Sequence, residues 1–476
     1  MTSSFGGINT ALTALYAQRR ALDVAGQNIA NANTEGYTRQ RVNMQAQAGS
    51  ITPAMNAKTD GLGTGVAVTG VQRMRDEYAE NRARIEHGNS AYLANQTQSY
   101  SAIEDTFAEP SATALQSQLQ DMWGTWSDVA NNKQLAATRS TLIQQSSTVA
   151  DGLNGAHDTL AGQFGESRAQ LAAYADEVNA TAKGVAQLND SIVRAKATGI
   201  AVNELEDQRE SQVMHLSELT GAITSMRPNG SMDVFIGGST LVSEFTTRSM
   251  EVSGAVRLDE QNTDPMTLRW ADTKTALSAG GTMGAMADTM TKIIPLISDA
   301  LDSVARNLAS SVNTKHAAGY GVDGSTGNDF FVSRVPGDPI TAGNIKVGIT
   351  NPDQVAVSST DPMLIVPPAT SGSLDNDVAD SIADVGNLVT GPDREYQAMI
   401  GQLGVSSQAA SRRNDIQATV TEQVDAERES ESGVNLDEEM TNLLTYQRGY
   451  EAASRVLTTI DSMLDQLINR TGLVGR

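Results

Sequence analysis

The chain has 476 residues, of which 39% are hydrophobic and 4% aromatic, and its formal net charge is −22 at pH 7. A surface this negative repels a phosphate backbone, so we expect neither nucleic acid nor an anionic membrane as a partner. The chain has no cysteine, which excludes disulfides, thiolate zinc sites and cysteine nucleophiles.

The sequence shows no segment suited to entering a membrane. No apolar run approaches the roughly 20 residues of a spanning helix, so we expect no membrane insertion. The first eighteen residues contain no lysine or arginine, and their apolar positions are periodic rather than continuous. A cleavable Sec-type signal peptide is therefore not visible. We expect a cytoplasmic protein, or one that leaves the cell by another route.

The two ends of the chain share one pattern. Residues 5–32 and 435–469 each carry apolar side chains at steps of three and four, which places them on one face of a helix. We expect the two segments to pair as a coiled-coil-like layer. The stripe consists of Phe5, Ile8, Leu12, Leu15, Leu22 and Ile29 in the first segment, and of Leu436, Met440, Leu443, Tyr450, Leu457, Ile460, Leu464 and Leu467 in the last.

A turn is expected directly after the first helix. Asn31, Asn33 and Gly36 tolerate the left-handed conformation that ends helices, and Tyr37 follows them. Residues 38–72 alternate and contain Pro53 and several glycines, which predicts short extended segments.

The middle of the chain alternates between helical and β-like stretches. Residues 74–220 are mostly helical, with breaks near Glu109-Pro110 and Thr198-Gly199. Residues 221–280 contain short β-like runs between turns, and helical periodicity resumes from 283 to about 317 with a kink or break at Pro295. A loop-rich stretch with strand candidates extends to about 370, and helices return from about 374.

This order predicts a mainly α fold with a β-rich insertion and a nested, multidomain layout. Residues 1–34 with 435–476 form a terminal helical assembly domain. Residues 35–220 with 281–434 form a long-helix domain that includes the extended segments. Residues 221–280 form a small, inserted β-rich outer domain.

Signatures of catalysis or ligand binding are missing from the sequence. The run from Gly61 to Gly65 has Val66 where a dinucleotide fingerprint needs glycine, and the run from Asp323 to Asp329 has Arg334 where a calcium loop needs glutamate. The four histidines are isolated, without zinc-ligand spacing. We therefore expect no catalytic residue, no cofactor, no metal and no enzymatic activity.

Capping residues indicate where the last helix begins. Asn435 is placed as its N-cap and Glu438 falls at position N3, in a variant of the capping box.

Burying about eight large apolar side chains does not offset the entropy of ordering some 60 residues, so a lone terminal hairpin is not stable. Its stripes need further helices, from the middle of the same chain or from neighbouring subunits, and periodicity alone favours ordinary intramolecular core helices.

Four runs of residues match a known family. The run Asn28-Ile29-Ala30-Asn31-Ala32-Asn33-Thr34-Glu35-Gly36-Tyr37-Thr38-Arg39-Gln40 resembles the N-terminal signature of bacterial flagellar axial proteins, which include rod, hook and hook-associated proteins. The run Glu431-Ser432-Gly433-Val434-Asn435-Leu436-Asp437-Glu438-Glu439 is more specific and resembles the hook-associated family of the hook–filament junction. Residues 203–209 and the segment from Val312 to Gly324 resemble internal parts of that family.

The resemblance implies an adaptor at the hook–filament junction that links hook to filament. Terminal helices of many subunits would form an inner tube, so the stripe residues, the turn residues and Val434 and Asn435 are the expected assembly interface. The implied partners are further copies of the chain in a ring-like homo-oligomer, the hook protein, a second hook-associated junction protein, and a cytoplasmic export chaperone at the C-terminal segment. The implied location is the extracellular flagellum, reached by type III export without a cleaved signal peptide.

Two alternatives stay open. Another flagellar axial subunit (hook, distal rod or filament) shares the terminal helices but is expected to lack the run from Ser432 to Glu439. A secreted hydrolase with its active site in residues 221–280 is a more remote alternative.

Overall fold

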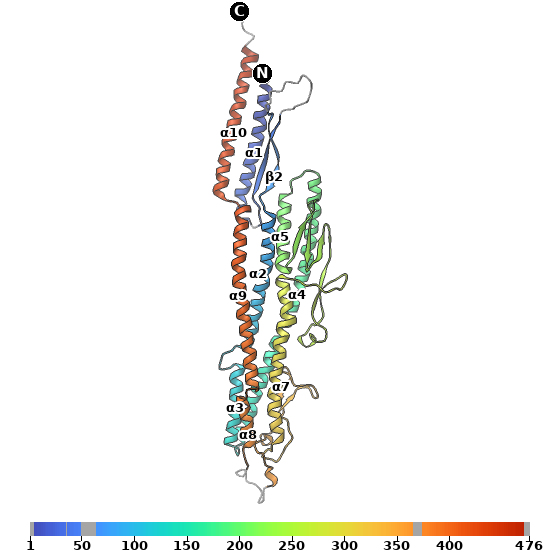
Figure 1. The fold of residues 1–476 in the computed structure, drawn as a ribbon, viewed down its shortest axis with the longest axis vertical. Coiled ribbons are helices and arrows are strands. Elements are labelled where there is room, and N and C mark those ends of the chain that lie inside the picture. Colours follow the sequence, from blue (N-terminus) through green and yellow to red (C-terminus); the bar gives the residue numbers. More distant parts are fainter. Residues whose placement is uncertain (1–3, 35, 49–62, 365–373, 471–476) are drawn as a thin grey trace, which may run out of the picture. The chain divides into compact units, whose positions relative to one another are not determined.

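The computed structural model describes residues 4–34, 36–48, 63–364 and 374–470. In these residues the fold is mainly helical (Figure 1), with four small antiparallel sheets, which confirms the predicted class at that level. Within the described ranges, no helix combines the length and the apolar character needed to cross a membrane.

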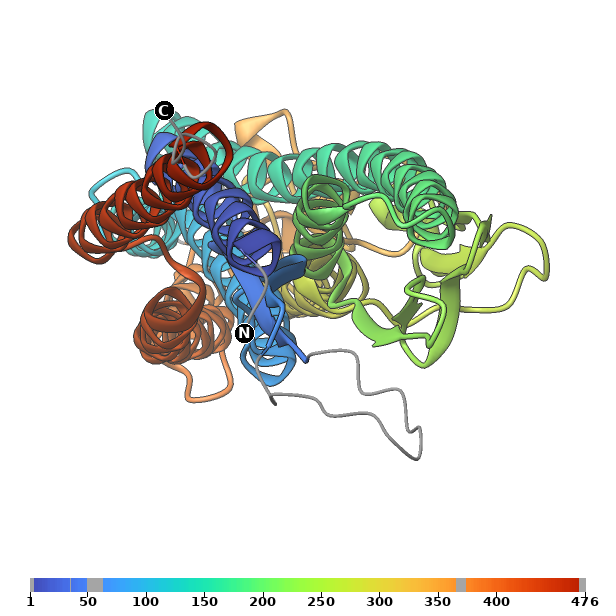
Figure 2. The same ribbon diagram turned by 90° about the horizontal axis from the view of Figure 1, so that it is seen from above.

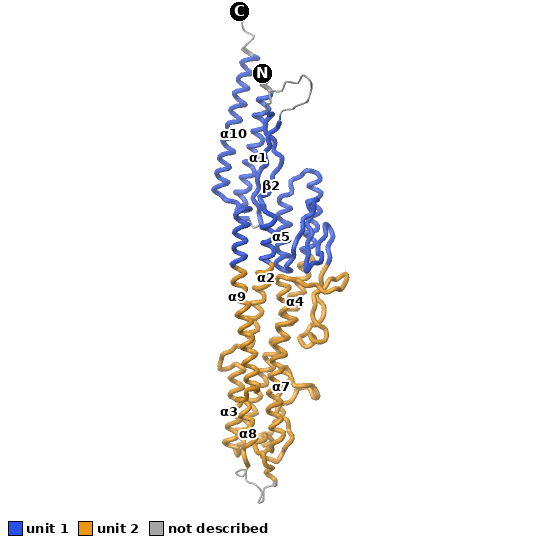
Figure 3. Tube along the Cα trace, in the orientation of Figure 1, with its two compact units in different colours: residues 1–87, 180–248, 419–476 blue, residues 88–179, 249–418 orange. Residues whose placement is uncertain are grey.

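The chain divides into two compact units (Figure 3). Unit 1 comprises residues 1–87, 180–248 and 419–476, and unit 2 comprises residues 88–179 and 249–418. Three long helices contribute residues to both units: α2 (Glu77–Phe107), α4 (Ala136–Ala197) and α9 (Pro392–Ser432). The predicted assignment of residues to three domains stays a prediction.

The two terminal helices lie side by side in unit 1 (Figures 1 and 2). Helix α1 spans Ser4–Ala30, and α10 spans Leu436–Asp465, followed by the π-helical turn η7 (Gln466–Arg470). Among the described side chains, the buried positions of the two helices are Ala11, Ala17, Ala21, Val24, Ala25 and Asn28 of α1, and Glu439 and Ala453 of α10.

Two glycines allow close contact between the terminal helices. A Cβ atom added at Gly7 would lie 3.0 Å from Ile460 Cδ1, and one at Gly449 would lie 2.9 Å from Gln18 Cδ. Gly449 weakens α10 by about 1 kcal/mol relative to alanine in propensity. In the structure, the missing side chain at Gly449 leaves room for Gln18 of α1.

A β-hairpin covers one side of α1. Strands β1 (Gln40–Gln47) and β2 (Gly65–Arg73) pair antiparallel, with Val42 opposite Val71. Val42 packs on Ala21 and Val24 of α1. The expected extended segments are confirmed, whereas Pro53 and Gly61 lie outside the described residues.

The rest of unit 1 is built around α5 (Asn203–Thr220). The predicted break before it is confirmed: α4 ends at Ala197, and Gly199 has a φ of 74°, in the left-handed region. After α5, four strands form an antiparallel sheet in the order β3-β4-β5-β6. Their bounds are Ile223–Met226, Met232–Ile236, Ser239–Ser243 and Thr246–Thr247.

In unit 2 the fully buried rings of Trp126, Phe330 and Phe331 pack together, with centroids 5.2 Å apart between Trp126 and Phe330 and 5.1 Å apart between Phe330 and Phe331. Its helices, besides parts of α2, α4 and α9, are α3 (Leu115–Asn131), α6 (Gly281–Asp288), α7 (Ile294–Ala318) and α8 (Asp377–Ala383). Its strands are β7 (Met250–Ser253), β8 (Thr267–Trp270), β9 (Phe331–Ser333) and β10 (Ile345–Val347). Short 3-10 turns are η1 (Leu258–Glu260), η3 (Pro352–Gln354), η4 (Pro362–Leu364) and η6 (Asp384–Asn387).

The predicted irregularity at Pro295 takes a specific form. The π-helical turn η2 (Thr289–Ile293) lies between α6 and α7, and Pro295 occupies the first turn of α7. Proline has no N–H to donate to the preceding turn, and a wider π turn tolerates that missing bond. The helical path therefore continues through this proline.

Candidate assembly interface

The two terminal signature runs meet at one buried side chain, Asn28 of α1, which is 1% exposed. Its amide nitrogen donates to the Gln40 carbonyl oxygen at 2.8 Å and to Glu439 Oε2 of α10 at 3.2 Å. Its amide oxygen accepts from Tyr37 Oη at 2.9 Å and from the Gln40 N–H at 3.0 Å. Asn28 thus uses its full set of two donors and two acceptor positions.

Arg39 spans the break between α9 and α10. Its backbone N–H donates to the carbonyl of Ser432, the last residue of α9, at 3.0 Å. Its side chain donates through Nε to Glu439 Oε1 at 2.7 Å, and through both terminal nitrogens to Glu438 at 2.7 and 3.1 Å. A planar guanidinium held at three points fixes the path from α9 into α10.

The start of α10 agrees with the predicted N-cap and adds a second role for Glu438. Asn435 Oδ1 accepts from the N–H groups of Asp437 and Glu438 at 3.0 and 3.2 Å, which confirms the cap. The hydrogen bonds from Arg39 lower the pKa of Glu438. The carboxylate expected in a capping box therefore binds Arg39, from the N-terminal run.

Helix α5 brings a third run of the chain to the same place. Asn203 donates to Gln40 Oε1 at 3.0 Å, and Asp207 accepts from the Thr38 N–H at 3.3 Å. Arg73, at the end of β2, pairs with Asp207 at 2.7 Å and with Glu206 at 2.9 Å. Segments 28–40, 203–209 and 431–439, which the sequence linked only through a family resemblance, thus form one hydrogen-bonded cluster.

A buried charge network continues from this cluster along α5. Glu210 forms salt bridges with Arg75 and Arg84, each with an N–O distance of 2.6 Å, and the fully buried Arg209 lies beside it. Burial raises the pKa of Glu210, but the hydrogen bond from Arg75 and the three arginine charges outweigh it and hold the pKa at about 2. Arg209 also donates to the Gly230 carbonyl at 2.8 Å, which ties α5 to the sheet β3-β4-β5-β6.

The described side chains of the predicted stripe are exposed or half-buried, and one of them, Ile460 of α10, lies against Gly7 of α1. Leu12, Leu436, Met440, Tyr450 and Leu467 are exposed. The half-buried members are Ile8, Leu15, Leu22, Ile29, Leu443, Leu457, Ile460 and Leu464. Phe5 belongs to α1, but its side chain lies outside the described part. Sequence periodicity did not single out the buried alanines of these helices, which are Ala11, Ala17, Ala21, Ala25 and Ala453.

Several exposed apolar residues of the terminal helices were not in the predicted stripe. They are Tyr16 (65% exposed) on α1, Leu444, Val456 and Met463 on α10, and Ile468 (75% exposed) in η7. Each is adjacent in sequence to a stripe residue. The signal that could have found them is that α10 is apolar on more than one face, whereas the prediction followed a single face.

The predicted turn residues have distinct positions. Asn31 donates to the Gln27 carbonyl at 3.0 Å and accepts from Thr34 Oγ1 at 3.3 Å, and Gly36 has a φ of 76°. Asn33 is exposed, and Val434 is half-buried. Burial, with the charges of Asp207, Glu204 and Glu439, raises the pKa of Tyr37 to about 12.

A pocket of about 620 Å³ opens between this turn and α5. We call it the acidic pocket because two of its described lining residues are carboxylates and none is basic. Its lining residues are Gln27, Asn31, Thr34, Gly36, Tyr37, Glu204, Asp207, Gln208, Ser211 and Gln212.

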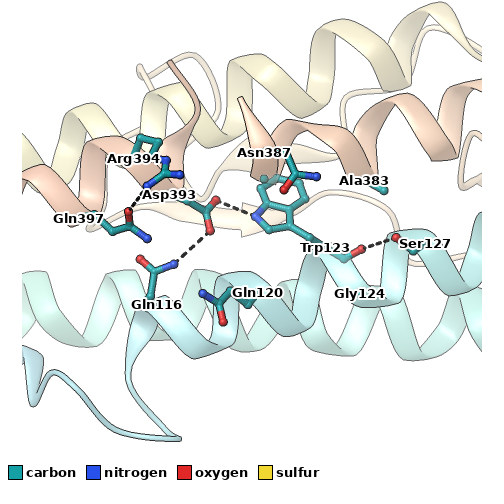
Figure 4. Close-up of a pocket in the computed structure, with 11 residues that line it drawn as sticks. Gln116, Gln120, Trp123, Gly124, Ser127, Ala383, Asn387, Asp393, Arg394 and Gln397 are labelled. Atoms are coloured by element: carbon teal, nitrogen blue, oxygen red, sulfur yellow. Dashed lines mark hydrogen bonds between the residues drawn. The ribbon is translucent and has the colours of Figure 1, made fainter. Parts of the chain in front are cut away.

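A second pocket, of about 400 Å³, lies in unit 2 at the start of α9 (Figure 4). Asp393 is buried there and accepts from Trp123 Nε1 at 2.7 Å and from Gln116 Nε2 at 3.3 Å. Burial raises the pKa of Asp393. A Cβ atom added at Gly386 would lie 2.5 Å from the Trp123 ring. This arrangement anchors the start of α9 to α3.

Two histidines occupy opposite environments. His87 lies between Glu218 at 3.3 Å and Asp425 at 3.0 Å, and its hydrogen bond with Glu218 is the largest contribution to a raised pKa. His316 is buried against Trp126, and burial lowers its pKa. Across the residues that the structure describes, no three histidine, aspartate or glutamate side chains are grouped so that they could hold a metal ion.

Models of known families match three parts of the chain. Residues 100–331 match the helical domain of flagellar hook-associated protein FlgK. Residues 8–38 match the flagella basal body rod protein model, and residues 427–470 match the C-terminal model of the flagellar basal body rod FlgEFG proteins.

Relatives match over nearly the full length. Flagellar hook-associated protein 1 of Bacillus subtilis is 30% identical, and the match covers 100% of both chains. The protein of that name from Escherichia coli is 26% identical over 97% of this chain and 99% of its own. A solved structure titled the flagellar hook junction protein FlgK from Burkholderia pseudomallei has a TM-score of 0.62 at 14% identity, covers 74% of this chain and 100% of its own, and supports the fold.

Proposed function

The chain belongs to the flagellar hook-associated protein 1 family, and from this we propose that it is a structural adaptor that assembles at the hook–filament junction and links hook to filament. The linkage is made by intersubunit packing of the terminal helices α1 and α10. The assembly interface comprises the predicted stripe residues together with the turn that follows α1.

The observation that carries this proposal is the exposed apolar surface of the terminal pair. Residues such as Met440, Leu444 and Val456 are about half exposed on α10. Large apolar patches on a soluble surface are typical of interaction sites. Further helices from neighbouring copies would bury these side chains and add the stability that the lone pair lacks.

The distribution of charge supports self-association through the same segments. Residues 1–34 carry two arginines and one aspartate, and residues 435–476 carry four arginines and six carboxylates. These two segments together therefore account for only −1 of the net charge of −22. Copies that meet through their terminal helices avoid most of the repulsion that the rest of this acidic chain imposes.

The proposal includes particular partners and a route. Copies of the chain form a ring-like homo-oligomer that contacts the hook protein on one side and a second hook-associated junction protein on the other. A cytoplasmic chaperone binds the C-terminal segment before export. The chain reaches the extracellular flagellum without a cleaved signal peptide, and its role is structural rather than enzymatic.

The family models weigh against another axial subunit. The models that match the terminal segments are shared with rod proteins, but the one that matches residues 100–331 is specific to a hook-associated protein. A mutant that builds hooks and releases filament subunits would separate the junction role from a hook, rod or filament role.

The central test replaces exposed apolar residues of α10. In cells that express only the variant, Leu444→Glu with Val456→Glu is expected to leave hooks without attached filaments, because a charge cannot be buried between copies. The matched control places glutamates in unit 2, at Val389 and Val405, which are 87% and 66% exposed. Both purified variants should melt like the parent chain. Normal motility from the α10 variant would sink the proposal.

A further inference from the structure

The imidazole of His87 lies between carboxylates of two other helices. His87 is on α2, and its Nε2 is 3.0 Å from both carboxylate oxygens of Asp425 on α9. Its Nδ1 is 3.3 Å from Glu218 Oε1 on α5. All three residues belong to unit 1, where α2 lies between α5 and α9 (Figure 1). One side chain of α2 thus contacts both neighbouring helices.

Both contacts are favourable only when the ring carries two protons. A neutral imidazole has one N–H donor and one lone pair, whereas an imidazolium donates from both nitrogens. Each nitrogen of His87 faces a carboxylate, so a neutral ring would direct a lone pair at one of the two. The hydrogen bond with Glu218 raises the pKa of His87 above 6.5, burial opposes this, and the hydrogen bond with Asp425 raises the pKa further. The geometry is therefore that of a charged ring.

We propose that His87, Glu218 and Asp425 form a proton-dependent clamp that joins α5 to α9 through α2 and opens in alkaline solution. Loss of one proton breaks one of the two contacts, and the loss of either contact separates α5 from α9 at this point. Because the pKa of His87 is raised, the clamp is closed below pH 6.5 and opens as the pH rises through the raised value.

The charged neighbours of the clamp differ in whether they titrate near neutral pH. On α9, Arg428 lies 3.9 Å from Asp425. Between α2 and α9, Arg82 pairs with Glu427 at 3.1 Å. Arginine keeps its charge throughout the neutral and alkaline range. On α5, His215 lies one turn before the clamp, so its titration must be separated from that of the clamp by experiment.

The clamp is close to the candidate assembly interface. Asp425 precedes Ser432, the last residue of α9, by seven residues, which is about 10 Å at a rise of 1.5 Å per residue. The Ser432 carbonyl accepts from Arg39, which also binds the start of α10. We therefore expect an open clamp to loosen the path from α9 into α10. This consequence for assembly rests on the proposed function, whereas the clamp itself does not.

Distance measurements on the isolated full chain test the clamp. The chain has no cysteine, so spin labels attach only at introduced thiols. Ser211→Cys on α5 and Gln423→Cys on α9 place two labels at exposed positions of the joined helices. Pulsed electron paramagnetic resonance measures the label–label distances. We expect a narrow distribution at pH 6 and its replacement by a broader one at pH 9.

Three substitutions in the labelled chain separate the clamp from a general effect of pH. His87→Arg keeps a cation at both pH values and should keep the narrow distribution at pH 9. His87→Gln carries no charge and should give the broad distribution at both. The matched control, His215→Gln on α5, should respond to pH like the parent.

Two results of these measurements would overturn the clamp. The first is a parent distribution that is equally narrow at pH 6 and pH 9, which needs no substitution at the clamp itself. The second is a pH response that persists in His87→Gln and disappears in His215→Gln, because it would assign the titration to the other imidazole.

Filament release measures the consequence for assembly. Isolated flagella of the parent should lose filaments from their hooks faster at pH 9 than at pH 6, and those of His87→Arg at equal rates. Equal rates for the parent would overturn the link between the clamp and the path into α10. Failure of the proposed function is distinguished by cells that lack the chain and still keep filaments on their hooks, a result that leaves the distance measurements unchanged.

Discussion

Asn28 and Glu439 are 411 positions apart in the chain, yet their side chains share a buried hydrogen bond of 3.2 Å. Both residues belong to signature runs by which the sequence resembles flagellar axial proteins. The two runs therefore hold α1 against the start of α10, in addition to marking the family. The hydrogen bond joins α1 to the first turn of α10.

Replacing Asn28 should weaken unit 1. Asn28→Ala removes four hydrogen bonds and leaves buried partners unsatisfied, which we expect to cost about 2–3 kcal/mol of unfolding free energy. Asn28→Asp should cost more, because it buries a second carboxylate beside Glu439. Denaturant unfolding measures both, with Asn33→Ala at an exposed site as control. Unchanged stability in Asn28→Asp would contradict the assigned role.

Replacing Arg39 should loosen the start of α10. Lysine keeps the charge but cannot hold Glu438 and Glu439 at once through a planar fork, so Arg39→Lys is expected to cost about 1–3 kcal/mol. Hydrogen exchange should accelerate in the first turns of α10 and stay unchanged in unit 2. Arg41→Lys, at an exposed position of β1, is the control. Equal exchange in the two variants would show that Arg39 does not restrain α10.

Acid should destabilise the network around Glu210. Its folded pKa of about 2 lies below its ordinary value of 4.5, so its stabilising contribution is present above pH 4.5 and is lost as the pH falls towards 2. Glu210→Gln should remove that part of the pH dependence and leave three arginines without their shared carboxylate, at a cost of about 3–5 kcal/mol. Unfolding curves from pH 2.5 to 7 measure both effects. The prediction is contradicted if the unfolding free energy of Glu210→Gln falls with decreasing pH as steeply as that of the parent chain.

His87 should give unit 1 the opposite dependence near neutral pH. Its pKa is raised in the folded chain, so the stability it contributes is fully present below the ordinary value of 6.5 and is lost as the pH rises through the raised pKa. His87→Gln should therefore be least stable, relative to the parent chain, in mildly acidic solution. NMR titration of the imidazole, with unfolding curves between pH 5 and 9, checks this. A parent–variant difference that grows with pH would contradict it.

Two glycine substitutions in unit 2 should have opposite signs. Gly386→Ala places a methyl group 2.5 Å from the Trp123 ring, which is expected to cost about 1–3 kcal/mol through overpacking. Gly401→Ala, in α9, has nothing within 4 Å of the added atom and should gain up to about 1 kcal/mol. Thermal unfolding compares the two. Equal effects would show that Trp123 moves aside freely.

Much of the fold could be predicted because it depends on local properties. Periodic apolar residues indicated helices at 5–32 and 435–469, alternation indicated the extended segments of 38–72, and Asn435 was recognised as a helix cap. Each of these signals acts within a few residues. The break between α3 and α4 at residues 132–135 was not predicted, although Asn131 and Asn132 are of a type that favours turns.

The sequence by itself determined the class of fold, the apolar character of the two ends, and, through its signature runs, the family resemblance. Only the tertiary structure decided which contacts those features make: that Gly7 of α1 lies against Ile460 of α10, that Asn28 binds Glu439, and that Arg39 bridges α9 and α10. The physical reason is that periodicity specifies a helical face but not its occupant. Partners hundreds of residues apart are selected by packing and by hydrogen bonds that exist only once the chain has folded.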